Sequence, residues 1–216
     1  MRLLKLSQVS PYHIMGVFFV IAQIFIFSAL LFDSSTRPFL LWSCNNFCIL
    51  LIIACYRKDI QMIMGISYLG LVSQIVWVTD FASHLLGYNL SGVTDYIYTE
   101  GFTYANNVSI AVHVIIPIVI LMFSFRVRPK TRSLLFALPY ILSLYVATIT
   151  LTPVAEDINC VFNACGNGKY LPYNIYLWPI YAVISTLVSF GIHYLLYYGG
   201  GKAGAGFRHL VARKTT

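Results

Sequence analysis

Six apolar stretches in this chain are each long enough to cross a membrane as a helix. They cover residues 13–32, 38–55, 61–80, 103–125, 132–152 and 172–198. A helical crossing of the hydrocarbon core takes roughly 17–25 residues, and its backbone groups must be paired within the segment itself. The sequence therefore predicts an all-α polytopic membrane protein whose fold is a bundle of six transmembrane helices.

The composition excludes the soluble classes of protein. Of the 216 residues, 59% are hydrophobic and only 10% are charged, whereas soluble domains carry about 25% charged residues. Because so few charges cannot solvate a folded surface or form a nucleic-acid-binding arm, we expect membrane lipids as partners and no nucleic acid. The first apolar run also exceeds the roughly 7–15 residues of a signal-peptide core, and no A-x-A site follows it, which favours a retained span.

The distribution of charge predicts the orientation of the spans. With the N-terminus inside, 12 of the 14 Lys and Arg residues lie on the inner side, and the outer side keeps only Arg37 and Lys169. Because basic residues in short loops stay in the cytoplasm, both termini are predicted to be cytoplasmic. Residues 1–198 form the expected single domain, with a short helix in the outer loop at about 81–102. Residues 199–216, which begin with three glycines, form the expected flexible basic tail.

Two of the five cysteines fall in the last outer loop of this topology. Cys160 and Cys165 are close enough in sequence to bridge, and the glycines around them favour a tight turn. A disulfide is therefore predicted between them. No Cys or His spacing in the sequence resembles a zinc site, and no glycine-rich phosphate loop is present. We expect neither a metal nor a cofactor.

His113 is the one histidine deep within a predicted span. At a rise of about 1.5 Å per residue it lies roughly 15 Å below the outer end of the fourth span, near the midplane. Asn106 and Ser109 share its helical face, and Asn107 lies next to them. An ionisable residue at this depth indicates a functional site, and burial favours its neutral ring. Pro117 removes a backbone donor one turn later and is expected to bend the helix.

The second span is polar over its first turns. Ser43, Cys44, Asn45 and Asn46 follow one another, and Cys44 lies roughly 9 Å below the outer end at the same helical rise. A thiol or hydroxyl paired with His113 is the minimum apparatus for covalent acyl transfer. The structural alternative is that the asparagines only hydrogen-bond between helices, an interaction worth about 0.6 kcal/mol on average.

The third span ends close to the same membrane face, at Trp77 and Asp80. Asp80 is a candidate to orient or stabilise the imidazole of His113, and the alternative is an acid on the loop surface. We expect the polar residues near His113, together with Trp77, to contact a substrate. These residues are Asn45, Asn46, Asn106, Asn107, Asp80 and Trp77.

The segment after His113 carries a recognisable combination of features. His113 and Pro117 form a His-x-x-x-Pro pattern, which is followed by a basic loop (Arg126–Arg132) and an aromatic, proline-containing fifth span. With the Asn-containing second span, this combination resembles the androgen-induced-gene and ADTRP superfamily of six-span membrane proteins. The closest match is to its bacterial-type branch, and the resemblance covers roughly residues 36–198.

The resemblance implies an intramembrane hydrolase of fatty-acid esters of hydroxy fatty acids. Characterised members use a Thr nucleophile with a His, and His113 takes the histidine role. This sequence has no threonine at the equivalent position, where it contains Trp42, Ser43 and Cys44 instead. A distant acyltransferase relative uses Cys with His, which makes Cys44 the preferred nucleophile and Ser43 the reserve.

Two classes of function follow from these residues. The first is a membrane-embedded acyl hydrolase or acyltransferase that uses Cys44 or Ser43 with His113. The second is a small transporter or a non-catalytic membrane binding or accessory protein, in which polar half-spans line a cavity. Transporters commonly carry paired repeats, and no internal repeat is visible in the sequence.

Overall fold

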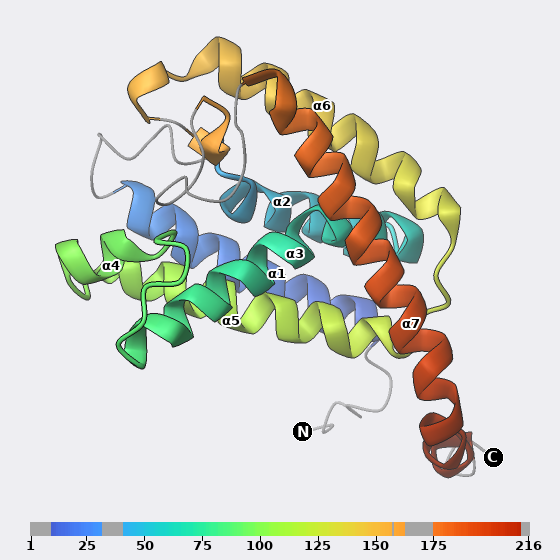
Figure 1. Cartoon of the computed structure of the whole chain (residues 1–216). Helices are drawn as coiled ribbons and strands as arrows, with labels where there is room; N and C mark the ends of the chain where they lie inside the picture. The colour runs from blue at the N-terminus through green and yellow to red at the C-terminus, as the bar shows by residue number, and fades with distance from the viewer. Residues whose placement is uncertain (1–9, 32–40, 157, 163–174, 213–216) are drawn as a thin grey trace, which may run out of the picture.

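The computed structural model describes residues 10–31, 41–156, 158–162 and 175–212 (Figure 1). Within these ranges every regular element is helical, which confirms the all-α class. The α-helices are α1 (Pro11–Leu31), α2 (Ser43–Tyr56), α3 (Ile60–Leu85), α4 (Asp95–Glu100), α5 (Tyr104–Ser124), α6 (Leu134–Leu151) and α7 (Trp178–Ala212). Short 3-10 turns lie between them at η3 (Thr131–Ser133), η4 (Val154–Glu156), η5 (Ile158–Cys160) and η6 (Ile175–Leu177).

Five helical segments are long and apolar enough to cross a membrane. They are Pro11–Leu31, Ile60–Leu85, Tyr104–Met122, Thr131–Leu151 and Ile175–Gly199. These segments match five of the six predicted spans and make this a multi-pass membrane protein. The second predicted span is α2, whose 14 residues extend about 21 Å, less than a hydrocarbon core of about 30 Å. Residues 38–40, where that span is predicted to begin, lie outside the described residues.

The most buried of the long helices is α3, which packs against α2, α5, α6 and α7. α1 packs against α2 and α5, and Figure 1 shows α1 and α5 running side by side. Apolar side chains of α1, α2, α3 and α5 form the main core, among them Phe19, Leu51, Ile66 and Ile116. The opposite faces of α1, α5, α6 and α7 expose large apolar side chains, which suits contact with lipid.

The start of α3 is fixed by a capping residue and a close backbone contact. Asp59 accepts hydrogen bonds from the N–H groups of Gln61 and Met62, at 3.0 and 3.1 Å. A Cβ at Gly65 would come within 2.1 Å of the Ser133 carbonyl oxygen, so only glycine allows this approach to the α5–α6 connection. The Ser133 hydroxyl also donates to Gln61 Oε1 at 2.7 Å.

A buried histidine joins α3, α7 and the segment after α5. Nε2 of His193 lies 2.7 Å from the Val127 carbonyl oxygen, and its Nδ1 lies 2.6 Å from the Tyr68 hydroxyl. Because a carbonyl oxygen only accepts, Nε2 carries the hydrogen, and Nδ1 of the neutral ring accepts from Tyr68. Both ring nitrogens of His193 are therefore paired.

α7 differs from the prediction at its C-terminal end. The last span is predicted to end at Tyr198 and a flexible tail to begin at Gly199, but α7 continues to Ala212. A glycine costs about 1 kcal/mol of helix propensity relative to alanine, yet it keeps the N–H that a helix requires. Pro117 in α5 and Pro139 in α6 also lie inside helices that continue past them.

Candidate functional site

His113 lies on the face of α5 that is turned towards α3. Its Nδ1 is 2.7 Å from the carbonyl oxygen of Ser109, one turn earlier, and its ring stacks on Trp77 with centroids 4.2 Å apart. Nδ1 therefore carries the hydrogen, because the carbonyl can only accept. Among the described residues, no hydrogen bond reaches Nε2. In the neutral ring this nitrogen holds the lone pair that a general base requires.

A chain of hydroxyl groups connects this histidine to α4. The Ser109 hydroxyl lies 3.3 Å from His113 Nδ1 and 3.0 Å from the hydroxyl of Tyr96. Burial raises the pKa of Tyr96 above its ordinary value, and Cys44 is near enough for a charge on its thiol to add to this shift. The phenol therefore stays protonated, and its hydroxyl is paired with the serine that lies beside His113.

Cys44 and Ser43 lie in the first turn of α2. The Cys44 side chain packs against the apolar core, and its sulfur is 3.8 Å from Oδ1 of Asn45. No described hydrogen bond joins either Cys44 or Ser43 to His113. Among the described residues, Cys44 on α2 and His113 on α5 therefore each have their own partners and share no hydrogen bond.

Asn159 holds the start of α2 in place. The sequence around it contains no motif that predicts this role. Its side chain accepts from the backbone N–H of Ser43 at 2.7 Å and donates to the Leu41 carbonyl oxygen at 2.8 Å. It also lies 3.2 Å from the Thr148 hydroxyl, and its main-chain oxygen accepts from the Trp178 indole at 2.8 Å. With φ at 58° it adopts the left-handed conformation that asparagine tolerates better than most residues.

The residue after Asn159 is disulfide-bonded. Cys160 forms a disulfide, whereas Cys44, Cys48 and Cys55 are free thiols. Cys165, the remaining cysteine of the sequence, lies outside the described residues, so its pairing with Cys160 stays a prediction. The free thiol of Cys44 meets the first requirement for a nucleophile.

The four candidate asparagines are used mainly in contacts within the protein. Asn46 Oδ1 accepts from the Tyr140 hydroxyl on α6, and Asn45 Oδ1 lies 3.8 Å from the sulfur of Cys44. Asn106 and Asn107 donate to main-chain carbonyls of the α4–α5 connection, at 2.7 and 3.1 Å. Their hydrogen bonds stabilise the ends of α2 and α5, and a contact with substrate stays a prediction.

Asp80 organises the loop between α3 and α4. The fully buried carboxylate accepts from the backbone N–H groups of Ser91, Gly92 and Thr94 and from the Thr94 hydroxyl, at 2.6 to 3.1 Å. The carbonyl oxygen of Ser109, not Asp80, receives the Nδ1 hydrogen of His113. Asp80 therefore acts on the site through α4, which it attaches to the end of α3.

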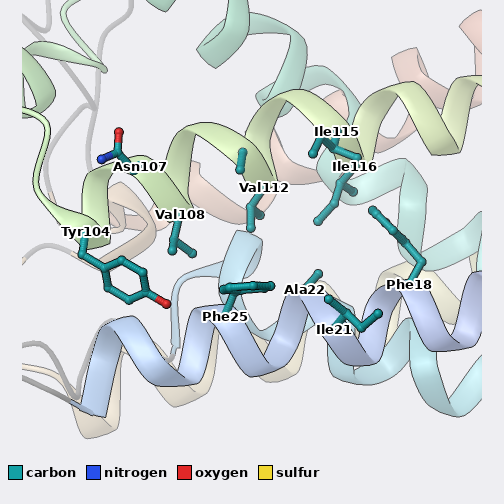
Figure 2. A pocket seen from close by; sticks show the side chains of 11 residues that line it. Phe18, Ile21, Ala22, Phe25, Tyr104, Asn107, Val108, Val112, Ile115 and Ile116 are labelled. Carbon is teal, nitrogen blue, oxygen red and sulfur yellow. The ribbon is translucent and has the colours of Figure 1, made fainter.

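An apolar groove lies on a different side of α5, between α5 and α1 (Figure 2). Its volume is about 340 Å³. The lining residues are Phe18, Ile21, Ala22 and Phe25 of α1 and Tyr104, Asn107, Val108, Ala111, Val112, Ile115 and Ile116 of α5. Because His113 stacks on Trp77 of α3, α5 itself separates this groove from the histidine.

Within the described residues, no group of three or more His, Cys, Asp or Glu side chains is arranged to hold a metal ion. The candidate site contains the buried imidazole of His113 and the free thiol of Cys44. Compared with family models, with curated proteins and with solved structures, the chain gives no significant match.

Proposed function

We propose that this protein is an intramembrane acyl-ester hydrolase or acyltransferase, with His113 as the general base and Cys44 as the nucleophile. The observation that carries the proposal is the half-paired ring of His113. Nδ1 is fixed by the Ser109 carbonyl oxygen, while Nε2 has no partner among the described residues. A base needs this combination of fixed orientation and a free lone pair.

The reaction proceeds through a thioester on Cys44. Nε2 of His113 takes the thiol proton, and the sulfur attacks the ester carbonyl carbon. The tetrahedral intermediate breaks its C–O bond, and the leaving alcohol receives the proton from His113. A water molecule, or an acceptor hydroxyl in the transferase, then attacks the thioester carbonyl carbon while His113 takes its proton. The C–S bond breaks, the fatty acid or new ester leaves, and His113 returns the proton to the sulfur of Cys44.

Direct contact between Cys44 and His113 must form when substrate binds. Catalytic hydrogen bonds are often long before the substrate is present, and among the described residues the thiol of Cys44 makes a single long hydrogen bond, at 3.8 Å to Asn45 Oδ1. Rotation about its Cα–Cβ bond turns the sulfur without moving α2. Ser43 is the reserve nucleophile, although its backbone N–H is bound to Asn159.

Labelling by an active-site probe tests the two roles. Protein in native membranes is treated with a lipid-like fluorophosphonate and, separately, with a thiol-directed acyl probe. Labelling is expected to be lost in Cys44→Ala and His113→Ala and kept in Cys55→Ala, which removes another free thiol of α2. Equal extraction and helical circular dichroism confirm that each variant is folded. Undiminished labelling in both active-site variants overturns the proposal and favours a transporter or a non-catalytic binding protein.

We also propose six spans with both termini in the cytoplasm. The support is the concentration of 12 of 14 basic residues on one side of this topology. Epitope tags at the two ends should be protected from protease in intact cells and cleaved after permeabilisation. A C-terminal tag that is cleaved in intact cells would mean an odd number of spans, with α2 failing to cross.

A further inference from the structure

The start of α2 takes its cap from a distant segment of the chain. Trp42 is the N-cap residue, and its side chain makes no capping hydrogen bond. The first N–H groups of a helix have no partner within the helix and need one elsewhere. For Ser43 this partner is Oδ1 of Asn159, at 2.7 Å. Figure 1 shows η5, the turn that carries Asn159, close to the start of α2.

The other polar groups of Asn159 attach it to two further helices. Its Nδ2 donates to the Leu41 carbonyl oxygen at 2.8 Å and lies 3.2 Å from the hydroxyl of Thr148 on α6. Its main-chain oxygen accepts from the indole of Trp178, the first residue of α7. A single asparagine thus fixes the start of α2 relative to α6 and α7.

The backbone of this turn adopts a conformation that needs support. Asn159 and Cys160 both have a positive φ, at 58° and 54°. Asparagine tolerates the left-handed region, whereas cysteine has no such advantage, and backbone of this kind persists where its surroundings hold it. Here the disulfide of Cys160 and the fully buried side chains of Ile158 and Val161 hold it. The covalent bond therefore lies directly beside the residue that caps α2.

The first turn of α2 carries both candidate nucleophiles. Ser43 donates its backbone N–H to Asn159, and Cys44 is the next residue. Among the described residues, the thiol of Cys44 makes a single long hydrogen bond, at 3.8 Å to Asn45. Because this contact does little to fix the sulfur, its position follows that of the turn.

From these contacts we propose that Asn159, held by the disulfide of Cys160, is a positioning residue that places the first turn of α2 and with it the thiol of Cys44. Its side-chain amide is used within the protein, so it is not a catalytic residue. The effect on turnover rests on the function proposed above, whereas the effect on α2 does not. In the proposed topology this turn lies on the outer side, where disulfides persist.

Hydrogen exchange at the start of α2 tests the structural step. Protein in lipid nanodiscs is transferred to deuterated buffer, and peptides that cover residues 41–48 are followed by mass spectrometry. Asn159→Gly keeps the left-handed backbone but removes the cap, so exchange at Ser43 should rise about tenfold, the effect of one hydrogen bond. Unchanged exchange in this variant overturns the proposal.

Two controls accompany this measurement. Asn89→Ala removes an amide that is bonded to Asp95 in the loop before α4, and it should leave exchange at Ser43 as in the wild type. Peptides of α3 should exchange equally in all variants, which shows that the bundle stays folded. A rise of the same size in Asn89→Ala overturns the proposal, because it means that any lost amide loosens the start of α2.

The part played by the disulfide is tested by removing it in two ways. Cys160→Ser removes it by substitution, and dithiothreitol reduces it in the wild-type protein. In the reduction two electrons and two protons pass from the dithiol to the two sulfurs, which become thiols, while the dithiol closes to a cyclic disulfide. Both treatments should raise exchange at Ser43, by a smaller factor than Asn159→Gly. Unchanged exchange in Cys160→Ser overturns the role of the disulfide.

Ester turnover separates positioning from a loss of stability. With rates normalised to folded protein, Asn159→Gly should lower kcat about 10²-fold, the cost of misplacing a reacting group by about 1 Å, and leave KM unchanged. Asn159→Asp keeps an oxygen for the Ser43 N–H and should restore most of kcat. Equal losses in the two variants, or a change in KM alone, overturn the positioning role. Full turnover in Cys44→Ala overturns the function proposed above, and the exchange experiment still decides how α2 is held.

Discussion

Two buried histidines, the ones that the described residues contain, differ in how completely their rings are paired. His193 donates from Nε2 to the Val127 carbonyl oxygen and accepts at Nδ1 from Tyr68, so its ring connects three parts of the chain. His113 donates from Nδ1 to its own helix and stacks on Trp77, and its Nε2 has no partner among the described residues. Both ring nitrogens of His193 are hydrogen-bonded, whereas the ring of His113 is held in one orientation and keeps an unpaired nitrogen among the described residues.

This difference separates a histidine that stabilises the fold from one that is able to transfer a proton. A buried polar group left without a partner costs free energy, so a purely structural histidine uses both nitrogens. A general base must leave one nitrogen open and still be held in position. In His113 the backbone carbonyl one turn earlier provides the orientation and leaves Nε2 available.

The largest expected effect is on acyl-ester turnover. Replacing His113 with Gln should lower turnover by about 10²- to 10⁴-fold, because general-base catalysis contributes that much. The matched His193→Gln variant should stay within about threefold of wild type once rates are normalised to folded protein. Turnover is measured with a chromogenic long-chain ester in detergent micelles. Equal losses in the two variants would contradict the distinction between the two histidines.

For the free energy of unfolding, the larger effect is expected at His193 and the smaller one at His113. His193→Ala strands the Tyr68 hydroxyl and the Val127 carbonyl oxygen, so the free energy of unfolding should fall by about 1–3 kcal/mol. His113→Ala should cost less, since the Ser109 carbonyl oxygen still has its helical N–H partner. Unfolding in mixed micelles with increasing sodium dodecyl sulfate, followed by circular dichroism, gives both values. A larger loss for His113→Ala than for His193→Ala would show that His113 is the structural residue.

A double-mutant cycle sharpens the role of His193. Tyr68→Phe combined with His193→Ala should show a coupling energy of about 0.6–1.7 kcal/mol, the range for hydrogen bonds between membrane helices. Tyr68→Phe combined with His113→Ala is the control pair, and its coupling should stay within about 0.5 kcal/mol of zero. Coupling of similar size in both pairs would mean that the bundle, not the hydrogen bond, transmits the effect.

The smallest effect is expected for the serine beside His113. Ser109→Ala removes the hydroxyl at 3.3 Å but keeps the carbonyl oxygen at 2.7 Å that orients the ring. Turnover in the ester assay should therefore change by less than about threefold. A loss as large as that of His113→Gln would show that the Ser109 hydroxyl, with Tyr96 behind it, takes part in proton transfer.

The features that local sequence predicts best are the apolar helices. Five of the predicted spans appear as helices of sufficient length because hydrophobic runs and helical pairing are properties of neighbouring residues. The short helix predicted in the loop at 81–102 is also present, as α4. α7 does not end at Gly199, where the flexible tail is predicted to begin. Low helix propensity of glycine is a weak determinant when the helical hydrogen bonds of the backbone are able to continue.

The contacts of the candidate site depend on residues far apart in the chain. Tyr96 reaches His113 through Ser109, Asp80 binds a loop eleven to fourteen residues later, and Asn159 pairs with a backbone N–H 116 residues away. Of these contacts, only the one between Ser109 and His113 follows from helical spacing. Asp80 is expected from the sequence to orient the imidazole because α3 ends near the same membrane face as the site. In the structure, the carbonyl oxygen of Ser109 on α5 accepts the Nδ1 hydrogen of His113 instead.

By itself, the sequence determined that this protein is helical and built for a membrane, and it singled out one histidine at mid-span. Those properties depend on hydrophobicity summed over short windows and on the cost of burying a polar group, both of which are local. Only the tertiary structure decided which nitrogen of His113 stays open, that α4 is attached beside it, and that a groove lies on the other side of α5. The position of α4 and the groove depend on how helices pack and on hydrogen bonds between distant segments, and the orientation of the His113 ring depends on Trp77 of α3 as well as on the carbonyl oxygen one turn earlier.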